Sequence, residues 1–164
     1  MAEWLIVIVI LNPHLPSIMK RPNPRSLPTS LKRTVSPNTD ILVQLFSDSI
    51  FVVITQRAGK LGTLLRCIHE HSVIDNSHTY HVETLMGKRD DNLAEVYARQ
   101  ITERIASMDS GGSTCPPVLL GIALKDGQSV EGKTGPESFH HIIGIVLDLY
   151  REGIEKVSSS PSKI

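Results

Sequence analysis

The 164-residue sequence is poor in aromatic residues and in cysteine. Phe, Trp and Tyr make up 4% of it, against 40% for hydrophobic residues as a whole, so we expect an aliphatic core. The two cysteines, Cys67 and Cys115, provide no disulfide framework and are typical of a protein from a reducing compartment.

The sequence also has no net charge, but its charged residues are unevenly distributed along the chain. The formal net charge is zero, yet the stretch from Trp4 to Thr39 holds five basic residues and no acidic one. Residues 40–164 hold 12 Lys and Arg against 16 Asp and Glu, a balance near −4. A nucleic-acid-binding domain normally presents a basic face, so this balance argues against one.

The sequence contains no apolar run of transmembrane length. Trp4–Leu11 is eight apolar residues, whereas a spanning helix needs about 20. Only Glu3 lies before this run as a charged residue, which does not fit a secretory signal peptide. Six prolines between residues 13 and 37 interrupt any regular element. We therefore expect residues 1–39 to form a disordered, Pro-rich basic extension, with an organelle-targeting segment as the alternative.

Residues 40–153 have the pattern of one folded domain. Short apolar and β-branched runs with short connections predict an antiparallel β-meander, and two longer stretches have helical periodicity. We predict an α+β fold in which two amphipathic helices flank the sheet, in the order β-β-β-β-α-β-α, followed by a flexible tail at 154–164. The predicted elements are strands Ile41–Phe46, Ile50–Thr55, Thr63–Ile68 and Thr79–Met86, helix Asp90–Met108, strand Pro117–Leu124 and helix Pro136–Glu152.

Each predicted helix has one apolar stripe. In the first, the stripe is Leu93, Val96, Tyr97, Ile101, Ile105 and Met108; in the second, it is Phe139, Ile142, Ile143, Val146, Leu147 and Tyr150, with Gly153 ending the helix. Three of the predicted strands are apolar on both faces. Two helices can cover both faces only if one lies on each side. Otherwise an apolar patch remains for a partner.

The segment Ile50–Ile68 predicts a hairpin with a polar, basic tip. Gly59 and Gly62 would supply the positive φ angles that such a turn requires. The tip does not match a phosphate-binding loop, because Ile54 and Leu61 stand where that motif needs Gly and Ser or Thr. The tip is either solvated or docks on an acidic partner surface. The candidate partner-binding residues are Gln56, Arg57, Lys60 and Leu61.

A Cys/His cluster gives an alternative reading. Cys67, His69 and His71 alternate, so an extended strand would place all three on one side, where they could bind zinc or copper. The competing interpretation is one buried thiol beside solvated loop histidines. The sequence has no Gly-x-Ser-x-Gly motif and no paired carboxylates in a glycosidase-like arrangement, so we predict no catalytic centre and no cofactor.

Four motifs in this order resemble the proteasome assembly chaperone 3 family. They are Ile50–Gln56, Gly59–Leu64, the strand-to-helix junction Thr84–Gly87, and Val118–Asp126. The resemblance implies a non-catalytic protein that pairs with a related small chaperone and binds an α-type subunit during 20S α-ring assembly. It implies that the protein acts in the cytoplasm or nucleus and that it binds neither nucleic acid nor a membrane.

The resemblance also implies one or two strands before Ile41, which the Pro-rich residues 12–39 do not predict. Either Trp4–Leu11 supplies this strand, or the chain is an atypical isoform whose open sheet edge would affect dimerisation. The alternatives to an assembly chaperone are a metal-binding module using the Cys/His cluster and a roadblock-like or profilin-like scaffold protein.

Overall fold

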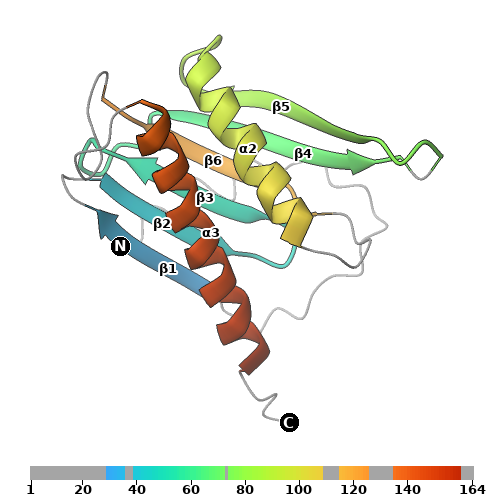
Figure 1. The fold of residues 1–164 in the computed structure, drawn as a ribbon. Coiled ribbons are helices and arrows are strands. Elements are labelled where there is room, and N and C mark those ends of the chain that lie inside the picture. Colours follow the sequence, from blue (N-terminus) through green and yellow to red (C-terminus); the bar gives the residue numbers. More distant parts are fainter. Residues whose placement is uncertain (1–28, 36–38, 73, 109–114, 126–134, 160–164) are drawn as a thin grey trace.

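The computed structural model describes residues 29–35, 39–72, 74–108, 115–125 and 135–159, which form a six-stranded mixed sheet and two helices (Figure 1). The α+β prediction is confirmed, with one additional strand at the start. The predicted extension 1–39 and tail 154–164 lie partly outside the described residues. The elements are β1 (Thr29–Val35), β2 (Thr39–Leu45), β3 (Ile50–Thr55), β4 (Thr63–His71), β5 (His78–Met86), α2 (Asn92–Met108), β6 (Val118–Ala123) and α3 (Pro136–Ser159).

The sheet is not the predicted meander, because its strand order is β1-β2-β3-β6-β4-β5. β6 lies between β3 and β4 and runs parallel to β3, whereas all other neighbours are antiparallel. The predicted antiparallel pairing within Ile50–Ile68 is therefore wrong. The reason is that β3 and β6 are apolar on both faces and take the central positions, and α2 carries the chain back across the sheet between β5 and β6.

Strand β1 lies in a stretch for which the sequence predicted no strand. It pairs with β2 along its whole length, from Thr29 opposite Leu45 to Val35 opposite Thr39. Its inward side chains are Leu31 and Val35, both buried, and between them Arg33, which donates to Glu152 of α3 at 2.7 Å. The alternation of apolar and polar residues that predicts a strand is interrupted here, because the middle inward position is an arginine. The predicted gap at this sheet edge is therefore filled without Trp4–Leu11, which lies outside the described residues.

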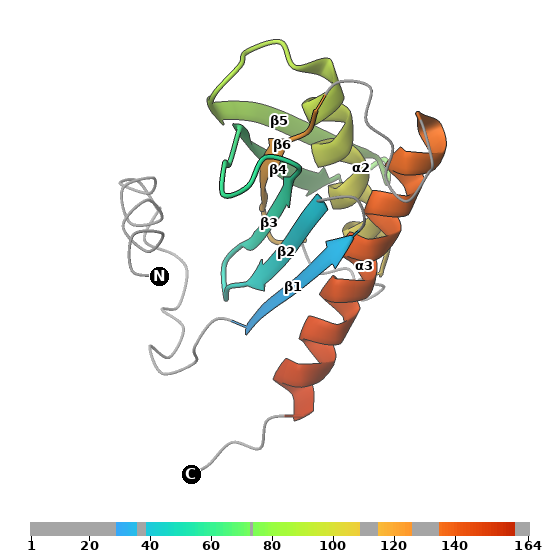
Figure 2. The same ribbon diagram turned by 90° about the vertical axis from the view of Figure 1, so that its left-hand side faces the viewer.

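Both helices cover the same face of the sheet. α2 packs on β4, β5 and β6, α3 packs on β1 and β2, and the helices contact each other. Figure 2 shows both helices on one side of the strands, leaving the opposite side without a helix. Of the two arrangements that the sequence allowed, the structure has the one that leaves an apolar patch.

The buried stripe of α2 differs from the predicted one. Tyr97, Ile101 and Ile105 are buried as expected, but Leu93 and Val96 are 55% and 52% exposed and Met108 is 37% exposed. The positions that complete the buried stripe are occupied by the small residues Ala94, Ala98 and Thr102. Small side chains let the helix backbone approach the sheet, and Thr102 Oγ1 donates to the Ala98 carbonyl at 2.8 Å.

Helix α3 continues beyond the predicted end at Glu152 to Ser159. Gly153 does not end the helix; it is buried within it. A Cβ atom at this position would lie 2.7 Å from Leu45 Cδ1 and 3.0 Å from Leu31 Cδ1. Gly153 therefore allows α3 to pack closely on β1 and β2, which explains why the residue is glycine without being a C-cap.

Tyr97 provides a spectroscopic test of this packing. Its side chain is 3% exposed, its ring centroid lies 4.6 Å from that of Phe139, and burial raises its pKa to about 12. Because the unfolded state ionises first, we expect stability to fall as the pH rises from 10 to 12, by about 3 kcal/mol. Tyrosinate absorbance followed against pH should show a late-titrating tyrosine that Tyr97→Phe removes. Complete ionisation near pH 10 in the native wild type would contradict this packing.

Candidate functional site

The face of the sheet opposite the helices carries a continuous apolar cluster. In β2, Ile41 and Val43 face the helices and are fully buried, whereas Leu42 faces the other side and is only half-buried. We call five half-buried apolar residues on this side the open-face cluster. Its members are Leu42, Phe51, Val53, Leu61 and Leu119.

Four members of the open-face cluster form two cross-strand pairs in the sheet. Leu42 is opposite Val53, and Phe51 is opposite Leu119. Leu61 lies over Gly121, which is the partner of Val53, and a Cβ atom on Gly121 would lie 2.3 Å from Leu61 Cδ1. The absence of a side chain on Gly121 thus lets the segment after the β3 turn fold back over the open face.

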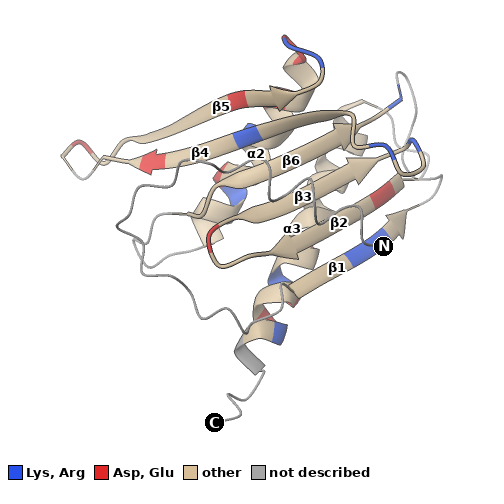
Figure 3. Cartoon of the chain, turned by 180° about the vertical axis from the view of Figure 1, so that it is seen from behind, with Lys and Arg blue, Asp and Glu red and all other residues tan. Residues whose placement is uncertain are grey.

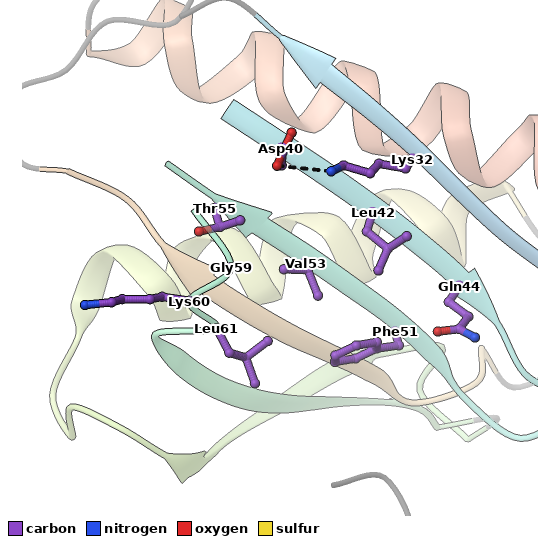
Figure 4. A pocket seen from close by; sticks show the side chains of 10 residues that line it. All are labelled: Lys32, Asp40, Leu42, Gln44, Phe51, Val53, Thr55, Gly59, Lys60 and Leu61. Carbon is purple, nitrogen blue, oxygen red and sulfur yellow. Dashed lines mark hydrogen bonds and ion pairs between the residues drawn. The ribbon is translucent and has the colours of Figure 1, made fainter. Parts of the chain in front are cut away.

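A pocket of about 310 Å³ lies within this face. Figure 4 shows Leu42, Phe51, Val53 and Leu61 around it, with Lys60 extending outward from its edge. Most of its lining surface is apolar, although five of the ten lining residues are polar or charged. The lining residues are Lys32, Asp40, Leu42, Gln44, Phe51, Val53, Thr55, Gly59, Lys60 and Leu61.

One wall of the pocket carries an ion pair that is satisfied within the protein. Thr34 Oγ1 donates to Asp40 Oδ1 at 2.7 Å, and Lys32 Nζ lies 3.1 Å from Asp40 Oδ2. The hydrogen bond from Thr34, with a further contribution from Lys32, holds the pKa of Asp40 below its ordinary value. Asp40 is therefore a carboxylate at neutral pH, with both oxygens engaged, and this wall is electrically balanced.

The four residues predicted to bind a partner fall into two groups. Lys60 and Leu61 line the pocket, and Arg57 is exposed in the adjoining turn. Gln56, in contrast, is only 4% exposed. Its amide Nε2 donates to Thr39 Oγ1 at 3.2 Å, and its Oε1 accepts from the Lys125 backbone N–H at 2.9 Å. Gln56 thus links the ends of three strands and cannot contact a partner.

The turn that presents Arg57 and Lys60 has the glycine conformations expected from the sequence. Gly59 and Gly62 have φ angles of 69° and 68°. The Lys60 backbone N–H donates to the Arg57 carbonyl at 2.8 Å, which closes the turn. The turn is therefore internally bonded although it does not connect paired strands.

The same end of the sheet forms a cationic rim, defined by Arg57, Lys60 and Lys125. All three are exposed, and the Lys125 backbone is held against the turn by Gln56. Figure 3, which views the open face, shows the turn after β3 in the colour of basic residues. Among the described residues, no carboxylate lies within ion-pair distance of Arg57 or Lys60. The rim thus offers charges for which the described chain supplies no counterion.

The Cys/His alternative finds no support in the described part of the chain. Cys67 is buried on the helix side, and burial raises the pKa of its thiol. His69 is also buried, and its Nε2 lies 2.9 Å from His78 Nδ1. His71 is exposed and stacks on His78 instead of joining Cys67. Within the described ranges, no group of three or more His, Cys, Asp or Glu is placed to hold a metal ion.

The candidate residues missed from the sequence are Leu42, Phe51, Val53 and Leu119. The signal was present in the continuous apolar runs of their strands, which required cover on both faces. That signal could not indicate which face would be left open, because it depends on where the helices pack.

No helix among the described residues is long and apolar enough to cross a membrane.

Comparison with solved structures supports the fold. A chain from the crystal structure of a novel chaperone complex for yeast 20S proteasome assembly aligns with 76% of this chain and 99% of its own length, with a TM-score of 0.51. The two sequences are 16% identical, so this likeness shows the shared fold alone. No curated protein matches the sequence.

The sequence also matches a family model, described as proteasome assembly chaperone 3, over residues 52–147. This span runs from within β3 through α2 and β6 into the first half of α3, and it includes the basic turn and Gly121, against which Leu61 packs. The match covers more than half of the chain. This match places the chain in the proteasome assembly chaperone 3 family, a family of non-catalytic chaperones.

Proposed function

We propose that this protein promotes 20S proteasome assembly by binding an α-type subunit together with a related small chaperone while the α-ring forms. We assign the related chaperone to the open face. The protein would act in the cytoplasm or nucleus and leave before the particle matures. Family membership supports a role in proteasome assembly. The open face supports the binding of a related chaperone through the sheet.

The observation that carries the proposal is the open-face cluster. Five large apolar side chains lie side by side on a sheet face that no described helix covers. Apolar patches of this kind on a folded protein mark interaction sites. A second sheet can pack on such a face at about 10 Å, with the side chains of both sheets interdigitating. A related chain of the same fold would present a sheet face suited to this packing.

The deciding experiment is affinity capture of the full chain from cells, with the bound proteins identified by mass spectrometry. The proposal expects one small chaperone of the same fold and free α-type subunits, and it expects finished 20S particles to be absent. Recovery of mature proteasomes alone, or of neither partner, would contradict it. Size-exclusion chromatography of the recombinant pair then tests whether the two chaperones bind directly.

Charge reversal in the cationic rim tests whether the turn contributes. We expect the double variant Arg57→Glu with Lys60→Glu to weaken capture of the chaperone partner by about tenfold, because two favourable rim charges become unfavourable. Folding should be unaffected, since both side chains are exposed. Titration calorimetry at two salt concentrations measures the effect, which should shrink at high salt.

The matched control for this variant is Arg99→Glu with Arg104→Glu, which reverses two exposed charges on α2. This control leaves the open face and its rim unchanged. If both double variants bind equally well, the turn is not part of the interface.

A further inference from the structure

The pocket in the open face combines an apolar interior with an unbalanced positive edge. Its interior is formed by the cluster residues Leu42, Phe51, Val53 and Leu61, which come from two strands and the segment after the turn. A volume of about 310 Å³ is at the lower end of the range for ligand pockets. This space suits one large side chain better than a cofactor.

The charges around the pocket are not equivalent. On one side, Lys32 is neutralised by Asp40 at 3.1 Å, and Thr34 occupies the second oxygen of that carboxylate. On the other side, Lys60 and the neighbouring Arg57 have no ion-pair partner among the described residues. A ligand in the pocket would therefore meet a net positive field at the Lys60 edge and a balanced one at the Asp40 wall.

We propose that the pocket receives a large apolar side chain of the partner protein, and that a carboxylate next to that side chain pairs with Lys60 or Arg57. This inference rests on the proposed function, because it presumes that the open face docks a protein. Buried apolar anchors in pockets carry much of the affinity of protein interfaces, and complementary rim charges fix their orientation. The anchor would be aromatic or long aliphatic, adjacent to Asp or Glu.

A protein segment fits these observations better than a free small molecule. The pocket lies within a continuous apolar face, and the adjoining cluster member Leu119, which is opposite Phe51, would stay exposed beside a small ligand. A partner's sheet or loop would cover Leu119 while its anchor fills the pocket. Binding of a free small molecule is one of the outcomes that the test below distinguishes.

The test uses two dipeptide probes on the isolated full chain, N-acetyl-Trp-Glu-amide and N-acetyl-Trp-Lys-amide, with N-acetyl-Gly-Glu-amide to remove the anchor. Binding is followed by NMR shifts of the methyl groups of Leu42, Val53 and Leu61. We expect the Trp-Glu probe to bind about fivefold more tightly than the Trp-Lys probe, from the change of one exposed charge pair. The Gly-Glu probe should not shift these methyl groups.

Two variants separate the anchor from the charge. Arg57→Glu combined with Lys60→Glu should reverse the order of the two Trp probes, whereas the control Arg99→Glu with Arg104→Glu on α2 should keep it. Val53→Phe adds volume on the open face, where strand positions accept aromatic residues, and should weaken both Trp probes at least tenfold. Circular dichroism confirms that the variants are folded.

The outcomes distinguish this inference from the proposed function. Equal binding of the two Trp probes, or shifts at residues outside the pocket, would overturn the inference even if partner chaperones are captured. Equally tight binding of free indole and Trp-Glu would show a small-molecule site and would also overturn it. Pocket-specific, charge-dependent probe binding without capture of any chaperone would support the pocket chemistry and refute the proposed function.

Discussion

Replacing Gly62 by alanine is expected to lower the free energy of unfolding by about 4 kcal/mol, from the cost of a left-handed backbone and of overpacking. Gly62 has a φ of 68°, and its Cβ would lie 2.1 Å from the Ile122 carbonyl oxygen and 2.8 Å from Ala123 Cβ. These atoms belong to central strand β6 and cannot move without breaking its pairing. Equilibrium unfolding in guanidinium chloride measures the loss.

Gly59 provides a matched control within the same turn. Its φ of 69° is nearly identical, but a Cβ atom there would have no neighbour within 4 Å. Gly59→Ala should therefore cost only the backbone strain, about 1 kcal/mol. Similar losses for both variants would mean that the close approach of the turn to β6 contributes nothing to stability.

The second large effect concerns binding rather than folding. Val53→Asp places a carboxylate at the centre of the open-face cluster, next to Leu42 in the sheet. In a complex that charge would be buried without a partner, at a cost of about 3–5 kcal/mol, so we expect capture of the related chaperone to fall by at least a hundredfold. The isolated protein should remain folded, because Val53 lies outside the main core between sheet and helices.

Val96→Asp is the control for this variant, since it makes the same change at a position on α2 that is 52% exposed. Pull-down and calorimetry with the chaperone partner provide the comparison. If Val53→Asp and Val96→Asp bind equally well, the open face is not the docking surface, and the proposal loses the observation that carries it.

The sequence predicted most elements but not their arrangement in space. The apolar runs located the five strands from residue 39 onward, and the stripe of α3 was largely right because Ile142, Ile143 and Val146 are all buried. The local sequence pattern, however, does not show which strands pair with one another in the sheet. β6 could be recognised as a central strand but not as the neighbour of β3, since neighbouring strands are usually consecutive in sequence.

The candidate site shows the same limit at the level of single residues. Arg57 and Lys60 were correctly expected to be exposed, because charged side chains in a glycine turn have no reason to be buried. Gln56 follows directly on β3 and looks equally polar, yet three-dimensional packing surrounds it with Thr39 and Lys125. When a polar residue is buried through hydrogen bonds to distant segments, the residues next to it in the sequence do not indicate that burial.

The insertion of β6 between β3 and β4 has a consequence for synthesis on the ribosome. Until Val118–Ala123 has emerged, β1-β2-β3 and β4-β5 are two separate sheets, each with an unpaired edge that the finished protein covers. Such edges are templates for aggregation. A nascent chain of this protein must therefore wait for its last strand before it can close its sheet, and the central pairing forms last although it is the most buried.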